Sequence, residues 1–151
     1  MKHPERIELA PGYSISRIIT GLWQVADIEK EDGSMDLGPA ASALVDYAES
    51  GFDTFDMADH YGSAELIAGH ARRKMQENDS ANRPSSQARF HTKWCPKPGE
   101  MTPQKVRDGV LLSAERLDTE QIDLMQFHWW NYEHPQYLDA MEGLQALKEE
   151  G

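Results

Sequence analysis

The sequence predicts an α/β fold in which a short β-hairpin precedes four strand–helix units with parallel strands. Segments rich in β-branched and aromatic residues alternate four times with longer segments whose apolar residues recur at helical spacing. The positions at which the four expected strands end are 33, 37 and 35 residues apart, which is about the length of one strand–helix unit. Such an alternation implies parallel strands joined by right-handed crossovers.

The N-terminal third is expected to hold the hairpin, the first strand and the first helix. Pro11-Gly12 separates two segments with apolar alternation, so residues 6–16 form the hairpin. Residues 17–21 (RIITG) form the first strand, and the polar segment 27–38 forms a loop. Pro39 is expected at the first position of a helix, whose apolar residues are Ala40, Ala41, Leu44, Val45 and Ala48.

The second unit begins with a strand over residues 52–56, preceded by Gly51. A loop rich in ionisable residues follows, and Ser63 is expected to cap the next helix. The apolar face of this helix includes Leu66, Ile67 and Met75, and the polar segment 76–87 is expected to be a surface loop.

The third and fourth units are expected over residues 89–151. Residues 89–94 (RFHTKW) and 122–127 (IDLMQF) form the strands. Thr102 and Pro103 begin a helix with an apolar stripe made of Val106, Val110, Leu111, Ala114 and Leu117. Pro135 opens the last helix, Gly151 suits its C-terminus, and its apolar face is made of Leu138, Met141, Leu144 and Leu147.

Composition argues against several classes of partner. The chain has 151 residues, 39% hydrophobic and 27% charged, which is typical of one folded globular domain. Its net charge of −11 argues against nucleic acid and against anionic membrane surfaces as partners. One cysteine, Cys95, excludes an internal disulfide. Since neither a secretory signal nor an apolar segment of the ~20 residues needed to span a bilayer is found, we expect a cytoplasmic protein.

Five side chains are expected to converge at the C-terminal ends of the strands. Trp23, Asp56, Lys93 and His128 stand at the ends of the four strands, and Tyr61 lies in the second loop. A phenol is a weak acid near neutral pH, and a neighbouring ammonium group favours its ionised form. This set fits a general acid for an oxygen that gains negative charge, as a carbonyl does when it accepts a hydride. Alternatively, each is an ordinary solvated strand end.

The other candidate residues fall into two groups. Trp23, Trp94 and Trp129 either wall an apolar substrate pocket or serve as ordinary core and rim packing. Cys95 has no histidine placed to activate it as a nucleophile.

The remaining ionisable residues carry less weight. Asp59 and His60 are interpreted as solvated loop residues, and His91 is expected to share a strand face with Lys93 inside the fold. No pair of His, Cys, Asp or Glu has a spacing that indicates a metal site, so no metal is expected.

Three segments resemble the aldo-keto reductase family. GFDTFDMADHYGSAE (residues 51–65) resembles the family signature, in which a strand ending in Asp leads within five residues to Tyr-Gly. HTKW (91–94) resembles the segment with the family's strand-end lysine, and LDTEQIDLMQFHW (117–129) resembles the segment that ends in its active-site histidine. The first strand, RIITGLW, and the N-terminal hairpin also resemble those of the family, whose hairpin closes the bottom of the barrel.

The resemblance implies a (β/α)₈ barrel of the TIM-barrel type, of which residues 1–151 supply the hairpin and the first four βα units as one half-barrel domain. It implies Tyr61 as the proton donor, Lys93 as the cation that strengthens this acid, Asp56 as the partner of Lys93, and His128 as the residue that orients the substrate. It further implies NADP(H) as the cofactor, with NAD(H) as the alternative, near Trp23 and Asp56. The expected substrate is an aldehyde or a ketone.

Two features depart from the family pattern. Trp130 stands where many members have proline, so the rim of the substrate pocket is expected to differ. A complete barrel takes ~250 residues, and in the family the cofactor's adenosine phosphate is held by the second half. Two hypotheses stay open: a carbonyl reductase, and a catalytically incomplete fragment or binding subunit. The open edges of a half barrel would favour self-association.

Overall fold

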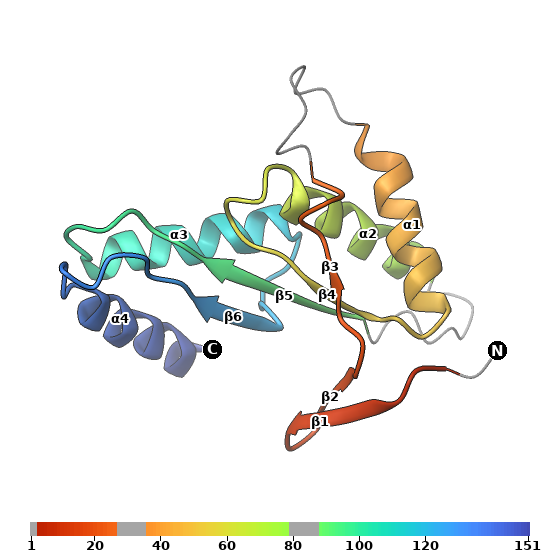
Figure 1. Cartoon of the computed structure of the whole chain (residues 1–151), viewed down its shortest axis with the longest axis horizontal. Coiled ribbons are helices and arrows are strands. Elements are labelled where there is room, and N and C mark those ends of the chain that lie inside the picture. Colours follow the sequence, from red (N-terminus) through yellow and green to blue (C-terminus); the bar gives the residue numbers. More distant parts are fainter. Residues whose placement is uncertain (1–2, 27–35, 79–87) are drawn as a thin grey trace.

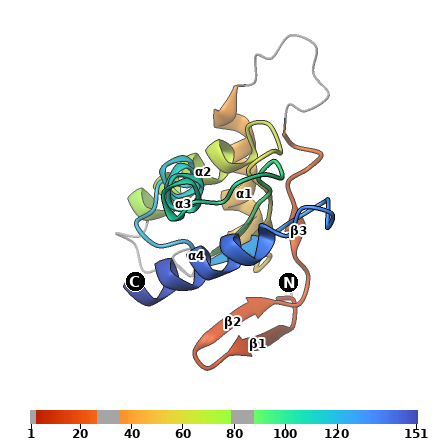
Figure 2. The same cartoon turned by 90° about the vertical axis from the view of Figure 1, so that its left-hand side faces the viewer.

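The computed structural model describes residues 3–26, 36–78 and 88–151. It consists of a two-stranded hairpin, a four-stranded parallel sheet and four helices, with α1, α2 and α3 together on one side of the strands (Figures 1 and 2). The elements are β1 (Arg6–Ala10), β2 (Tyr13–Ser16), β3 (Thr20–Gly21), α1 (Leu37–Glu49), β4 (Thr54–Asp56), α2 (Ala64–Asn78), β5 (Arg89–Trp94), α3 (Pro103–Arg116), β6 (Leu124–Phe127) and α4 (Tyr137–Glu150).

The sheet has the predicted parallel topology. Its strand order is β3-β4-β5-β6, and each strand is parallel to its neighbour. In this register Phe55 lies beside Phe90, and Lys93 lies beside Gln126. The four C-terminal strand ends therefore lie along one edge of the sheet, as in half of a (β/α) barrel.

The hairpin packs against the opposite, N-terminal end of the sheet. Strands β1 and β2 pair antiparallel around a turn in which Gly12 has a φ of 76°. The Tyr13 hydroxyl lies 2.9 Å from Nε2 of His91, and the Arg89 guanidinium lies 4.8 Å above the Tyr13 ring. His91 is buried on the same strand face as Lys93, because the two residues are separated by two positions.

Two hydrophobic clusters cover the helix side of the sheet. In the first, Phe55 and Phe90 stack with ring centroids 5.2 Å apart and are packed under α1 and α2. The second joins the ends of β5 and β6 to α3 and α4, and its buried residues are Trp94, Met101, Val106, Trp129 and Ala140. The first cluster fixes β4 and α2 relative to each other, because it contains Phe55 of β4 and Ala64 and Ile67 of α2.

Several predicted boundaries move. Strand β3 covers only Thr20–Gly21, and Ile18 and Ile19 are exposed rather than paired. Helix α1 begins at Leu37 because Asp36 caps it, accepting a hydrogen bond from the Gly38 amide at 2.9 Å.

The later boundaries move by a few residues at most. Helix α2 continues to Asn78, β6 begins at Leu124 and α4 begins at Tyr137. Strand β5 and the cap of α3 by Thr102 lie where they were predicted. Most of the two predicted loops, residues 27–35 and 79–87, lies outside the described residues.

Candidate active site

The loop from β4 to α2 runs along the end of β5 and is fixed to it by backbone hydrogen bonds. The amide of Met57 donates to the carbonyl of His91, and the amide of Asp59 donates to the carbonyl of Lys93, each at 2.9 Å. The chain then turns at Gly62, which has a φ of 47°, and enters α2. This path carries Tyr61 back towards the strand ends.

Lys93 and Asp56 form an ion pair at the inner face of the sheet. The Lys93 ammonium lies 2.6 Å from Oδ2 of Asp56 and 2.8 Å from the carbonyl oxygen of Met57. The other oxygen of Asp56, Oδ1, accepts a hydrogen bond from the side-chain amide of Gln126 at 3.1 Å. The ammonium is therefore held by two acceptors, and the carboxylate bridges β4, β5 and β6.

Tyr61 lies directly beside this ion pair. The Lys93 Nζ atom is 5.2 Å from the centroid of the Tyr61 ring. The Trp23 ring meets Tyr61 edge to face at 4.6 Å, and the His60 ring does so at 4.9 Å. A cation over an aromatic face is attracted by the ring, so the structure brings the phenol, the ammonium and the carboxylate into one group.

His128 follows β6 at the same edge of the sheet. Its backbone amide donates to the carbonyl of Trp94 at 2.9 Å, which extends the pairing of β5 and β6 by one step. Its imidazole packs against the Trp130 ring with centroids 4.1 Å apart. The structure therefore places His128 at the edge of the sheet where Trp23, Asp56, Tyr61 and Lys93 also lie.

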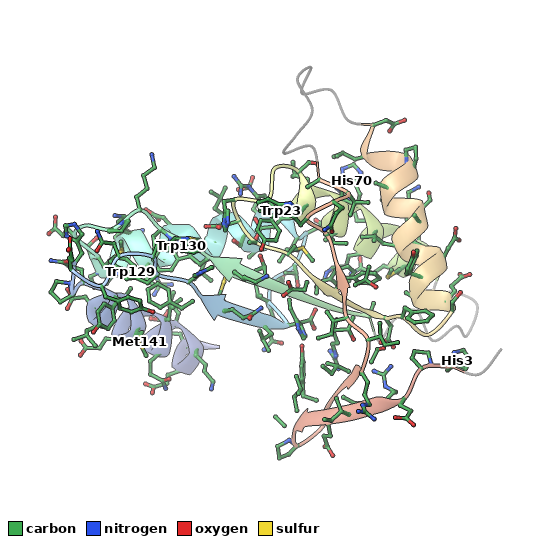
Figure 3. All side chains as sticks on the ribbon, in the orientation of Figure 1. His3, Trp23, His70, Trp129, Trp130 and Met141 are labelled. Atoms are coloured by element: carbon green, nitrogen blue, oxygen red, sulfur yellow. The ribbon has the colours of Figure 1, made fainter. Side chains whose placement is uncertain are left out.

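Two of the three tryptophans predicted to wall a pocket lie elsewhere. Trp94 and Trp129 are each only 5% exposed and belong to the second hydrophobic cluster. Successive residues of a strand point to opposite faces, so Trp94 faces the helices while Lys93 faces inward. Both indoles serve core packing, which corrects the pocket-wall interpretation. Figure 3 shows Trp129 and Trp130 near the ends of β5 and β6. The third tryptophan, Trp23, is 40% exposed and lies beside Tyr61.

The sequence interpretation missed the part played by Asp59. Its side chain accepts a hydrogen bond from the Cys95 amide at 3.0 Å through Oδ2 and contacts Nδ1 of His60 at 2.9 Å through Oδ1. Aspartate often bonds backbone amides in turns, and this was the available signal. Asp59 is therefore an anchor of the loop rather than a solvated residue.

A second anchor comes from α3. Glu65 is 2% exposed; it accepts a hydrogen bond from the Thr92 hydroxyl at 2.6 Å and lies 3.3 Å from Nη1 of Arg116. The same Arg116 nitrogen donates to the carbonyl of Asp59 at 3.1 Å. A buried carboxylate is tolerated where it is paired in this way. Arg116 of α3 thus fixes the position of the loop that carries Tyr61, although α2 and β5 separate this helix from the loop in the chain.

Cys95 is a free thiol at the end of β5. Burial raises the pKa of the thiol, the Asp59 carboxylate adds to this effect, and a hydrogen bond from Trp130 opposes it. The thiolate is the nucleophilic form of cysteine, so these surroundings do not activate it.

Across residues 3–26, 36–78 and 88–151, no three His, Cys, Asp or Glu side chains cluster as metal ligands would. The described helices include none with the length and apolarity needed to cross a membrane.

The sequence model of the Aldo/keto reductase family matches residues 17–151. The chain belongs to the aldo/keto reductase family. This aldo/keto reductase chain has no match among curated proteins.

Solved structures share its fold. An aldo-keto reductase from Bombyx mori in complex with NADP is 20% identical with a TM-score of 0.71, and the match covers 99% of this chain and 48% of that one. A putative aldo-keto reductase from Pseudomonas aeruginosa is 23% identical with a TM-score of 0.70, covering 99% and 56%. One from Brucella melitensis is 20% identical with a TM-score of 0.67, covering 100% and 50%. The chain spans about half the length of these relatives.

Proposed function

We propose that this chain carries the catalytic residues of an NADP-dependent oxidoreductase that reduces aldehydes and ketones to alcohols. The observation that supports this most directly is the Asp56–Lys93 ion pair, with the ammonium 5.2 Å from the centroid of the Tyr61 ring at the C-terminal edge of the sheet. A positioned phenol beside a fixed cation is suited to give a proton to an oxygen that is becoming negative.

Each residue has one role in the proposed reaction. The Tyr61 hydroxyl donates its proton to the carbonyl oxygen, and the Lys93 ammonium stabilises the phenolate that remains. Asp56 and the carbonyl oxygen of Met57 hold the ammonium in place, through contacts of 2.6 and 2.8 Å. His128 donates a hydrogen bond that orients the carbonyl oxygen. Solvent then returns a proton to Tyr61, so the substrate has gained a hydride at carbon and a proton at oxygen.

The residues at the edge fit the nicotinamide end of a dinucleotide. Trp23 presents a flat indole, 40% exposed, next to Tyr61. The Asp56 side chain is 32% exposed, so its oxygens remain accessible to a hydroxyl group besides their contacts with Lys93 and Gln126. When bound, the cofactor supplies the hydride. We propose NADP(H), which the Bombyx mori relative binds, and NAD(H) remains the alternative.

We also propose that residues 1–151 act as one half-barrel unit of a complete (β/α)₈ barrel. The full set of proposed proton-transfer residues lies within this unit, while the chain spans about half the length of the solved relatives. The free thiol of Cys95 suits a reducing, cytoplasmic location.

The decisive experiment replaces Tyr61 by Phe in the full-length protein. Because the change removes the proposed proton donor, NADPH-dependent reduction of benzaldehyde should fall by ~10²–10⁴-fold. Binding of NADPH, followed by its fluorescence, should stay nearly unchanged. The matched control is Tyr47→Phe, an exposed tyrosine on α1 that should leave turnover unaffected. Turnover by Tyr61→Phe close to that of the wild type would refute the assignment.

A further inference from the structure

The loop after β6 contains an exposed tryptophan that the proposed reaction does not use. Trp130 is 68% exposed, whereas its neighbour Trp129 is 5% exposed and belongs to the second hydrophobic cluster. The Trp129 indole N–H donates to the backbone carbonyls of Asn131 and His134, at 2.7 and 3.2 Å. Trp129 therefore stabilises the loop after β6 from inside. The indole that is exposed and could contact a substrate is that of Trp130.

Two contacts fix the orientation of the Trp130 ring. One face packs on the His128 imidazole, with centroids 4.1 Å apart and planes inclined by 32°. The indole N–H donates to the sulfur of Cys95 at 2.8 Å. A tryptophan N–H usually finds a partner, and ring pairs of this kind contribute specific geometry beyond buried area. The ring is thus held from β5 and from the loop after β6 although most of its surface is open to solvent.

The position of this ring relates it directly to the carbonyl oxygen of a substrate. His128 is the residue proposed to orient that oxygen, and Trp130 lies on it. A group attached to the carbonyl carbon would extend along the open part of the indole. A planar aromatic group stacks on such a surface, whereas a saturated ring of similar size meets it with fewer close contacts.

We propose that Trp130 is the specificity-determining residue of this site, and that it selects carbonyl substrates with an aromatic ring attached to the carbonyl carbon. Cys95 acts as a positioning residue by holding the indole N–H. This inference rests on the proposed carbonyl reductase function and deepens it.

The kinetic test compares benzaldehyde with cyclohexanecarboxaldehyde in the full-length protein. The wild type should have the higher kcat/KM for benzaldehyde, and Trp130→Leu should reduce the benzaldehyde preference by about 2- to 10-fold, mainly through KM. Trp130→Phe keeps an aromatic face but loses the N–H that Cys95 holds, so its preference should lie between those of the wild type and Trp130→Leu. The matched control is Tyr132→Leu, since Tyr132 lies on the same loop, is 72% exposed and packs on Tyr137 rather than on His128.

The Cys95 anchor is tested by a pair of variants. Cys95→Ala removes the acceptor of the indole N–H and should lower the benzaldehyde preference, while Cys95→Ser keeps an acceptor and should restore it. An equal preference in both variants and the wild type would overturn the positioning role.

A readout independent of catalysis is the NMR spectrum of the His128 imidazole protons. The nearby indole shifts these resonances through its ring current, so Trp130→Leu should move them and Tyr132→Leu should not. Unmoved resonances in Trp130→Leu would overturn the proposal, and so would an unaltered substrate preference in an active enzyme. If the wild type reduces neither aldehyde, the proposed function itself fails, and the inference fails with it.

Discussion

Tyr13 and His91 form a polar contact between the hairpin and β5 whose protonation is set by its surroundings. Burial is the main cause that lowers the pKa of His91 from its ordinary value of 6.5, although the Asp123 and Asp56 carboxylates oppose it. Burial and the Asp123 carboxylate raise the pKa of Tyr13 to about 12. Both groups are therefore favoured in their neutral forms in the folded protein.

The pH dependence of stability follows from these two directions. His91 has a lower pKa in the folded state than in the unfolded state. Its contribution to the free energy of unfolding is therefore fully present above pH 6.5 and is lost as the pH falls below that value. Tyr13 has a higher pKa in the folded state, so its contribution is present below pH 10.0 and is lost as the pH rises from there towards about 12.

We expect the free energy of unfolding, measured in urea, to decline on both sides of this interval. Tyr13→Phe should flatten the decline above pH 10.0 and leave the acid side in place. The control is Tyr47→Phe, which replaces an exposed tyrosine. A full alkaline decline in Tyr13→Phe would show that other groups cause it.

The sequence identified some site residues and not others for a physical reason. Asp56 and Lys93 stand at strand ends, and a regular strand–helix spacing reveals such positions. Gln126 is the fifth of six residues in its predicted strand, as Lys93 is in its own, but its uncharged side chain carried no chemical signal. Its amide reaches Asp56 at 3.1 Å because the parallel register sets β6 beside β5. Contacts of this kind depend on the relative placement of strands, which no local pattern encodes.

At the level of elements, small residues determine how closely the helices approach. A Cβ on Gly109 of α3 would lie 2.3 Å from Nε1 of Trp94, and one on Gly143 of α4 would lie 3.0 Å from Val106. Similarly, a Cβ on Gly69 of α2 would lie 2.2 Å from the backbone carbonyl oxygen of Arg116. These glycines allow contact distances that any side chain would prevent.

Gly69→Ala should destabilise the protein although alanine is the better helix former. The gain in helix propensity is about 1 kcal/mol. Overpacking typically costs about 1–3 kcal/mol, and a contact with a backbone atom should put the cost in the upper part of that range, at about 2–3 kcal/mol. We expect a net loss of about 1–2 kcal/mol and a Tm lower by roughly 2–8 °C. Calorimetry of Gly69→Ala beside Gln76→Ala, an exposed position on the same helix, measures it. An unchanged or higher Tm would mean that α2 and α3 are less closely packed.

Some residues of the predicted apolar helix faces are exposed, although Val106 and Leu117 of the predicted α3 face are buried. The sequence pattern placed Leu111 on the buried face of α3 and Met141 on that of α4, yet these side chains are 56% and 54% exposed. Ser113 and Ala140 are buried instead, because short side chains let the helices come near the sheet. Where the local signal was strong, as for β5 and the Thr102 cap of α3, the prediction was confirmed.

At the scale of the whole molecule, the described sheet ends in two outer strands, β3 and β6. Next to β3, Ile18 and Ile19 are 56% and 43% exposed. Unpaired strand edges and adjoining apolar side chains favour pairing with another chain. The net charge of −11 opposes association at long range, and salt screens this repulsion.

We therefore expect residues 1–151 to form dimers or larger species in solution, increasingly so at higher salt. Light scattering should show the higher mass, and the double variant Ile18→Lys/Ile19→Lys should shift the population towards the monomer. Tyr47→Lys, which changes an exposed aromatic residue far from β3 in sequence, is the control. A wild-type chain that is a uniform monomer at all salt concentrations would contradict the expectation.

The contacts of Arg116 imply a constraint on how this chain can change. Arg116 belongs to α3, yet it donates to the carbonyl of Asp59 and pairs with buried Glu65, so it helps to hold the loop that carries Tyr61. A descendant that keeps every residue proposed for proton transfer but loses Arg116 would leave Glu65 without its charged partner. We therefore expect substitutions of Glu65 and Arg116 to be tolerated only when both residues change together, so that the two positions covary among sequences that keep Tyr61.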